Sequence, residues 1–435
     1  MNAIKSIRNN PKKSIAGALV ATALGKWING LYNDHLFRFT MCHSVEHIGT
    51  EPIKSFEQPK KITVFLNPAA NSGKATTLFD KNAAPILYLS GCQITVIKSE
   101  YEGQAKQFMS VLDKPDMIVA AGGDGTVNEV VTGLLRRPDF ENWRDVPIGI
   151  IPLGKTNTIC RLLSNPNSDR PAKWIMESTS DLLEGKTRKM DIMKIEAETG
   201  GKPVFALSDI RWGSYRDAVE KTNKYWYFGP LKKYMTFVFA SFRTSIKTSR
   251  EIELSYIHPQ PIPVCEVKAD FKKLHQQATA SILSKLFGAL TWWWPWKDAV
   301  KSAYQPSIES TPVENPIQEK ADVYDVKDLS LKTLEFMVTA NSHDTSLKRE
   351  CAALNVSAEN DNFSMMDYIQ NGPNRNQTGR HKALHPTTEI ECSKLEIKPD
   401  NVEGTWFSVD SENYEAMPCT IEVIPNKLKM VCSSR

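Results

Sequence analysis

Residues 117–126 read MIVAAGGDGT, an apolar run of strand length that ends in three glycines and an aspartate. The next apolar side chains recur at the spacing of one helical face, which is typical of a helix packed on a sheet. They are Val127, Val130, Val131, Leu134 and Leu135. The stretch therefore predicts a strand, a glycine-rich turn and a helix, which is the repeating unit of an α/β sheet.

Similar units lie on both sides of this one. We expect strands at 62–66, 92–97 and 148–151, and the first and last of these run into polar loops at 67–74 and 152–158. Strands that alternate with helices form a parallel sheet, and such sheets bind ligands at the carboxyl ends of their strands. The three loops should therefore meet at one edge of the sheet and form a nucleotide cleft.

The central loop has the residues that phosphate chemistry needs. Its glycines permit backbone conformations closed to other residues and let a ligand approach closely, and Asp124 adds a carboxylate where phosphate and magnesium would meet. Neither common phosphate motif fits, since Pro68 stands where a Walker A loop needs glycine and Asn128 stands where the dinucleotide fingerprint needs its last glycine. A tight turn with a capping aspartate is the alternative interpretation of residues 122–126.

Composition narrows the class of protein. The chain has 435 residues, which allows two or three domains. The 54 basic and 50 acidic side chains leave a net charge of +4, which does not indicate a nucleic-acid partner. The eight cysteines include no Cys-x-x-Cys pair. The pairs His43/His47 and His381/His385 have the i, i+4 spacing of metal ligands on a helix. No third metal ligand accompanies either pair, so we interpret them as solvated or packed histidines.

The amino-terminal segment is basic. Residues 1–33 contain five lysines or arginines and no acid, a bias that resembles a mitochondrial address. Its uncharged run, residues 14–25, is shorter than the about 20 residues that a bilayer-spanning helix needs. A secretory signal and a basic helix packed on the domain are the alternatives.

The carboxyl-terminal half predicts a β-rich module, because short alternating segments recur at 251–256 and 333–338. Prolines bracket an insert at about 259–325. Within its part 271–296 stand lysines and four closely spaced tryptophans, which suits a membrane interface more than a buried core. The tryptophans are Trp292, Trp293, Trp294 and Trp296.

These observations predict three parts of the chain. Residues 1–56 are a targeting or anchor segment with a linker, residues 57–198 the α/β domain with the nucleotide cleft, and residues 199–435 a β-rich domain that carries the insert.

The motifs resemble those of the diacylglycerol and sphingosine kinase family. The matching residues are Asn67-Pro68, Ser72-Gly73-Lys74, Gly122–Thr126 with Asn128-Glu129, Pro152-Leu153-Gly154 with Asn157, and the tail Val409-Asp410-Ser411-Glu412. Further segments resemble the mitochondrial acylglycerol kinases of that family; they are residues 64–67, 81–85, 101–106, 225–231 and 411–418. The resemblance covers about residues 1–258 and 325–435.

The resemblance implies a fold and a site. The fold is an α/β nucleotide-binding domain plus a β-rich, sandwich-like second domain, with the active site in the cleft between them. The resemblance makes residues 57–198 the ATP-binding catalytic domain and residues 199–435 the lipid-substrate domain. The resemblance assigns ATP binding to Asn67, Pro68, Ser72, Gly73, Lys74, Gly122, Gly123, Gly125, Thr126, Gly154, Asn157 and Lys232. It assigns catalysis to Asp124, Asp410 and Glu412, with Asp124 as the tentative Mg²⁺ ligand. Both Asp124 and Asp410 qualify as the base by chemistry, and we place Asp124 first.

The implied reaction is transfer of the γ-phosphate of ATP, with Mg²⁺, to monoacylglycerol and diacylglycerol, giving lysophosphatidic and phosphatidic acid. The implied location is the inner mitochondrial membrane, facing the intermembrane space, with membrane contact through residues 1–33 and 271–296. Alternatives are a ceramide- or sphingosine-type kinase and a structural subunit of the carrier translocase. Some positions depart from the family pattern. They are Lys155, Thr156 and Thr158 of the loop at 152–158, Ser411 of the tail, and Trp226 where sphingosine kinases have an arginine.

Overall fold

The computed structural model describes residues 11–50, 58–164, 170–243, 250–258, 326–340, 352–360, 365–375, 386–400 and 404–433. Residues 1–259 and 326–435 form one compact unit, and the description below concerns that unit. The predicted insert at 259–325, with its four tryptophans, and the pair His381/His385 lie outside the described residues.

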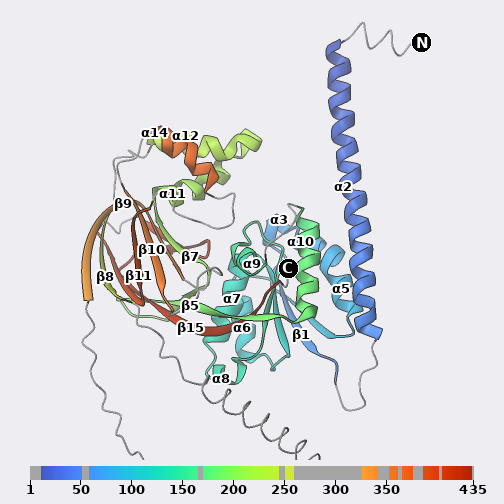
Figure 1. Cartoon of the computed structure of the whole chain (residues 1–435), viewed down its shortest axis with the longest axis horizontal. Coiled ribbons are helices and arrows are strands. Elements are labelled where there is room, and N and C mark those ends of the chain that lie inside the picture. The colour runs from blue at the N-terminus through green and yellow to red at the C-terminus, as the bar shows by residue number, and fades with distance from the viewer. Residues whose placement is uncertain are drawn as a thin grey trace, which may run out of the picture. The chain divides into compact units, whose positions relative to one another are not determined.

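The first part of the unit is an α/β domain (Figure 1). Its strands are β1 (Lys61–Leu66), β2 (Gln93–Lys98), β3 (Met117–Gly122) and β4 (Ile148–Pro152). Its helices are α3 (Ala70–Gly73), α4 (Ala75–Leu78), η1 (Phe79–Ala83), α5 (Ala84–Leu89), α6 (Gln104–Val111), α7 (Asp124–Leu135), α8 (Phe140–Trp143), α9 (Thr158–Leu163) and α10 (Pro171–Glu184). The four strands pair in parallel in the order β2-β1-β3-β4, which confirms the predicted parallel sheet.

The expected apolar helix face is buried. All six residues of β3 are buried, because helices cover both faces of this parallel sheet. The α7 side chains Val127, Val130, Val131 and Leu134 pack in one core cluster with Met109 of α6. This packing places the amino terminus of α7, and therefore Asp124, directly after β3.

The second part is β-rich and shares its sheet with the first. Its strands are β5 (Thr187–Ala197), β6 (Val204–Ala206), β7 (Asp209–Gly213), β8 (Arg250–Ile257), β9 (Val326–Ala340), β10 (Leu354–Asn360), β11 (Pro386–Cys392), β12 (Lys394–Pro399), β13 (Trp406–Val409), β14 (Glu412–Glu415) and β15 (Cys419–Val431). β15 pairs antiparallel with β5 and β12, and its Met430 pairs in parallel with Ile148 of β4. The fold is thus an α/β domain plus a β-rich domain, as predicted.

A group of helices lies at one end of the β-rich strands (Figure 1). It comprises α11 (Ser214–Glu220), η2 (Lys221–Leu231), α12 (Lys232–Arg243), α14 (Met365–Asn371) and η4 (Gly372–Asn374). Tyr215, Phe237 and Tyr368 of this group pack together with Leu334 of β9. The carboxylate of Glu335, the next residue of β9, accepts the backbone N–H groups of Tyr215 and Arg216 at 3.1 and 3.3 Å, which anchors α11 to the sheet.

The chain begins with the long helix α2 (Pro11–Thr50). Its carboxyl-terminal half packs on α5 and α10 through Met41 and Val45. Its other half exposes a line of large apolar side chains at helical spacing, namely Val20, Leu24, Trp27, Ile28 and Leu31. Among the described residues, no helix combines the length and the apolar character that crossing a membrane requires.

Candidate active site

The three loops predicted to meet do lie together. Asn67 leads out of β1, and its side-chain Nδ2 donates to Thr126 Oγ1 of the central loop at 3.1 Å. The N–H of Asp124 donates to the carbonyl of Thr156 at 3.2 Å, and the N–H of Gly154 donates to the carbonyl of Gly122 at 3.0 Å. Hydrogen bonds therefore join each outer loop to the central one.

Two glycines bring the second and third loops into backbone contact. A Cβ on Gly154 would lie 2.3 Å from the Cα of Gly123, so no side chain fits between the loops. Asn157 stabilises the turn that follows, because its side chain accepts the N–H of Gly154 at 3.1 Å and donates to its carbonyl at 2.9 Å. Glycine at position 154 is a packing requirement of this site.

The first loop holds three successive residues in the left-handed region. The φ angles are 53° at Asn71, 58° at Ser72 and 81° at Gly73. Left-handed backbone is unfavourable for residues other than glycine and often marks a ligand site. Successive N–H groups in such turns form a concave surface that suits anions. The loop geometry therefore matches the phosphate-binding role expected for it.

These loops border a pocket of about 510 Å³, which we call the nucleotide pocket. Of the predicted site residues, its lining includes Asn67, Ser72, Gly123, Asp124, Gly125, Thr126, Gly154 and Glu412. The lining omits Pro68, Gly73, Lys74, Gly122, Asn157, Lys232 and Asp410. It adds Glu100, Tyr101 and Glu102 from the turn after β2, which the sequence analysis did not assign to the site.

Asp124 is a buried carboxylate that anchors a helix. It is 1% exposed, and its two oxygens accept the N–H groups of Thr158 and Ile159, each at 3.0 Å. Desolvation raises the pKa of Asp124, and these two backbone hydrogen bonds oppose the rise. The side chain therefore ties the central loop to the amino terminus of α9 while it borders the nucleotide pocket.

Asp410 is equally buried but lies apart from the nucleotide pocket. Its carboxylate accepts the N–H groups of Leu207 and Ser208, each at 2.7 Å, and the side-chain amide of Asn128 at 3.4 Å. Burial raises the pKa of Asp410 to about 7, against the effect of the two short backbone hydrogen bonds. Asp410 thus joins the β13–β14 turn to the α/β domain through Asn128 of α7.

Glu412 is the tail carboxylate that faces the nucleotide pocket. Its Oε1 lies 2.9 Å from the position that a Cβ on Gly125 would take, and its Oε2 accepts the hydroxyl of Tyr414 at 3.0 Å. Burial raises the pKa of Glu412, the Tyr414 hydrogen bond lowers it, and the nearby Glu129 raises it. Glu412 therefore brings the β-rich domain into contact with the central glycine loop.

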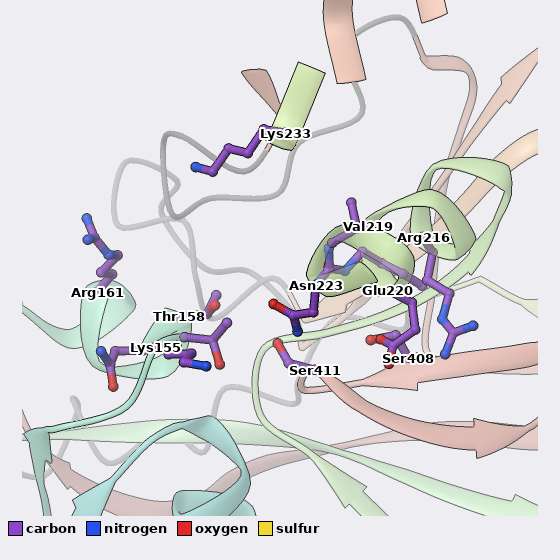
Figure 2. A pocket seen from close by; sticks show the side chains of 13 residues that line it. Lys155, Thr158, Arg161, Arg216, Val219, Glu220, Asn223, Lys233, Ser408 and Ser411 are labelled. Carbon is purple, nitrogen blue, oxygen red and sulfur yellow. The ribbon is translucent and has the colours of Figure 1, made fainter. Parts of the chain in front are cut away.

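A second pocket, of about 400 Å³, adjoins the first. We call it the basic pocket, because its lining includes Lys155, Arg161, Arg211, Arg216 and Lys233. Figure 2 shows Lys155, Thr158 and Arg161 on one wall and Arg216, Glu220 and Asn223 on the other, with Ser408 and Ser411 near the second wall. Lys155 and Thr156 line both pockets.

Most of these basic residues were not among the site residues expected from the sequence. Lys232 was expected there, whereas the structure places the neighbouring Lys233 on the basic pocket. Arg216 stands inside the Trp212–Asp217 segment, and Arg161 lies in the last turn of α9. These residues come together only when the two domains pack, so no local sequence pattern could predict their clustering.

The described residues form no preassembled metal cage. Among them, no three His, Cys, Asp or Glu side chains gather closely enough to hold a metal ion. In enzymes that bind nucleotides, Mg²⁺ is usually held by phosphates together with one or two carboxylates. The carboxylates that border the nucleotide pocket are Glu100, Glu102, Asp124, Glu129 and Glu412.

The sequence families that the chain matches make it a lipid kinase of the diacylglycerol kinase type. The family model of the diacylglycerol kinase catalytic domain matches residues 61–195, and that of the acylglycerol kinase C-terminal region matches residues 207–435. The chain belongs to the acylglycerol kinase family, and it is an enzyme that uses ATP as co-substrate.

Curated relatives agree along nearly the whole chain. The protein named "Acylglycerol kinase, mitochondrial" from Xenopus laevis is 37% identical over 98% of this chain and 94% of its own length. The protein of that name from Homo sapiens is 36% identical over 99% of this chain and 96% of its own length. Sphingosine kinase 1 of Arabidopsis thaliana is 30% identical over only 40% of this chain and 36% of its own length.

The fold also has a counterpart among solved structures. A putative diacylglycerol kinase from Bacillus anthracis str. Sterne superposes with a TM-score of 0.50 and 15% identity, covering 86% of this chain and 99% of its own. At that identity the likeness supports the fold alone.

Proposed function

We propose that this enzyme transfers the γ-phosphate of ATP to monoacylglycerol and diacylglycerol, giving lysophosphatidic and phosphatidic acid. The observation that carries the proposal is the pair of adjoining pockets that share Lys155 and Thr156. A nucleotide in the first pocket would place its terminal phosphate beside an acceptor in the second. The names of the relatives support the acylglycerol substrates.

We assign the loops at 67–74, 122–126 and 154–157 to ATP binding. Phosphoryl transfer asks mainly for positioning and for neutralisation of charge. Mg²⁺ would neutralise charge on the phosphates, with Glu412 as a protein contact, which leaves Asp124 to take the proton of the acceptor. Asp124 borders the nucleotide pocket and Asp410 does not, so we favour Asp124 at the reaction centre and Asp410 as the residue that holds the domains together.

The catalytic step needs few groups from the protein. The acceptor hydroxyl attacks the γ-phosphorus, the bond from that phosphorus to the bridging β,γ-oxygen breaks, and the hydroxyl proton passes to a carboxylate. Burial raises the pKa of Asp124, which makes its carboxylate a better proton acceptor than an exposed one. The glycine N–H groups and Lys155 would stabilise charge on the phosphate oxygens.

A panel of acceptors tests the substrate assignment. Purified protein would be given labelled ATP, Mg²⁺ and, separately, monoacylglycerol, diacylglycerol, ceramide and sphingosine in mixed micelles. We expect label in the two glycerolipids. Label in ceramide or sphingosine alone would replace the proposal with the sphingolipid alternative.

We also propose the mitochondrial inner membrane, facing the intermembrane space, as the location. The relatives' names, the basic amino-terminal residues and the exposed apolar line on α2 support this proposal. We retain the division into residues 1–56, 57–198 and 199–435, with the insert at 259–325 and residues 1–33 as membrane contacts. A structural role in the carrier translocase could coexist with catalysis, and α2 offers a surface for such a partner.

A further inference from the structure

The basic pocket carries more positive charge than a neutral acceptor requires. Within it, Arg211 pairs with Asp209 at 2.9 Å and Arg216 pairs with Asp217 at 2.9 Å. The other three cations, Lys155, Arg161 and Lys233, have no carboxylate partner among the described residues, although Glu220 also lines the pocket. Lys155 also borders the nucleotide pocket and can face the ATP phosphates, and Arg161 lies over the Trp174 ring at 4.8 Å. An uncharged acylglycerol headgroup still offers no anion to Arg161 or Lys233.

One buried donor in the lining also lacks a partner. Arg216 is 7% exposed, and its Nε is buried without a hydrogen-bond acceptor among the described residues. The other two nitrogens of this guanidinium donate to Asp217 and Asn413, which fixes its charge beside the pocket. Guanidinium and ammonium groups together match the several acceptor oxygens of a phosphate.

We propose that the basic pocket is a phosphate-monoester site, and that it binds the phosphate of a phosphorylated lipid while nucleotide occupies the adjoining pocket. The identity of that lipid as lysophosphatidic or phosphatidic acid rests on the proposed function. Arg161 and Lys233 line the basic pocket and not the nucleotide pocket, so the site does not depend on ATP phosphates for its charge. Phosphorylated lipid bound there competes with the lipid acceptor and not with ATP.

Direct binding tests this site without an activity assay. Hexanoyl lysophosphatidic acid, which is water-soluble, would be titrated calorimetrically into the full chain saturated with a non-hydrolysable ATP analogue. The same titration would be made with Arg161→Gln/Lys233→Gln and with the control Lys224→Gln, which alters an exposed lysine outside both pockets. We expect binding by the wild type and the control, and a dissociation constant at least tenfold higher in the double variant.

Two outcomes would overturn the site. The first is loss of binding when the analogue is present, which would make the pocket part of the triphosphate site. The second is equal affinity in the double variant with an unchanged melting temperature.

A titration with inorganic phosphate distinguishes the two possible sources of the bound phosphate group. Tighter binding of the lipid assigns the pocket to lipid phosphate, and equal binding assigns it to free phosphate. Either result upholds a phosphate site in this pocket. Absence of glycerolipid phosphorylation in the acceptor panel would contradict the proposed function and leave this binding result intact.

Discussion

At the residue scale, two aspartates singled out by the sequence use their oxygens to hold backbone. Asp124 accepts two N–H groups of α9, and Asp410 accepts those of Leu207 and Ser208. The carboxylates thus shape the cleft as well as supplying charge to it. A substitution at either position therefore changes both geometry and chemistry, and a useful test must separate the two.

We predict that Asp124→Asn lowers phosphoryl transfer by about 100-fold or more, because the carboxylate is the proposed base. The amide keeps one acceptor oxygen, so stability should fall by only about 1–2 kcal/mol. Rate and denaturant unfolding would be measured together, with exposed Asp145→Asn as the control. Full activity in folded Asp124→Asn would remove Asp124 from the reaction centre.

A second prediction concerns the buried Glu335 beneath α11. Desolvation raises its pKa from 4.5 to about 7 in the folded protein, against the lowering effect of Arg375. Between these values the folded state holds a proton that the unfolded chain has released. The free energy of unfolding therefore falls as pH rises from about 4.5 to about 7, by up to about 1.4 kcal/mol per pH unit.

Glu335→Gln should remove the share of that fall that Glu335 causes, because glutamine stays neutral and keeps an acceptor for the N–H groups of α11. The share of Asp410, whose pKa burial also raises to about 7, should remain. Urea unfolding at pH 5, 6, 7 and 8 would measure the slope. Exposed Glu253→Gln, on β8, is the control and should retain the wild-type slope. A variant slope equal to the wild type would show that Glu335 does not titrate in this range.

At the element scale, the exposed apolar line on α2 has a testable role. Trp27 is 63% exposed and Leu31 is 52% exposed. Both precede Met41 and Val45, the residues through which α2 packs on α5 and α10. We predict that Trp27→Ser/Leu31→Ser weakens binding to vesicles that contain anionic lipid, since the basic, apolar segment suits such an interface.

Vesicle flotation would measure the binding, and activity in detergent micelles should stay within about twofold of the wild type if only docking is lost. Tyr88→Ser changes another exposed aromatic, on α5, and serves as the control. Vesicle binding that survives the α2 substitutions would direct attention to the other membrane contact proposed, in the insert.

The elements that the sequence predicted well are those with strong local patterns. The strand at 117–121 became β3 (Met117–Gly122), and the apolar face after it became the buried side of α7. The helical group from α11 to α12 was not predicted within the β-rich half. Its anchor is a carboxylate on β9, a contact between distant residues that leaves no local periodicity.

At the scale of the whole molecule, one sheet runs through both domains. β15 pairs with β5 and β12 of the β-rich domain and, through Met430, with β4 of the α/β domain. This continuity holds the tail motif against the central loop, so that Glu412 contacts Gly125 and Asp410 reaches Asn128. The sequence predicted the members of the site, and packing of the domains selected which of them face a pocket.

The most direct test of the proposed acylglycerol kinase reaction uses the purified chain with Mg²⁺ and labelled ATP. It measures transfer of the labelled γ-phosphate to monoacylglycerol in mixed micelles. We predict labelled lysophosphatidic acid from the wild type and from Asp145→Asn, with at least about 100-fold less from Asp124→Asn. Folded protein that binds ATP and yields no labelled lipid from monoacylglycerol or diacylglycerol would contradict the central claim.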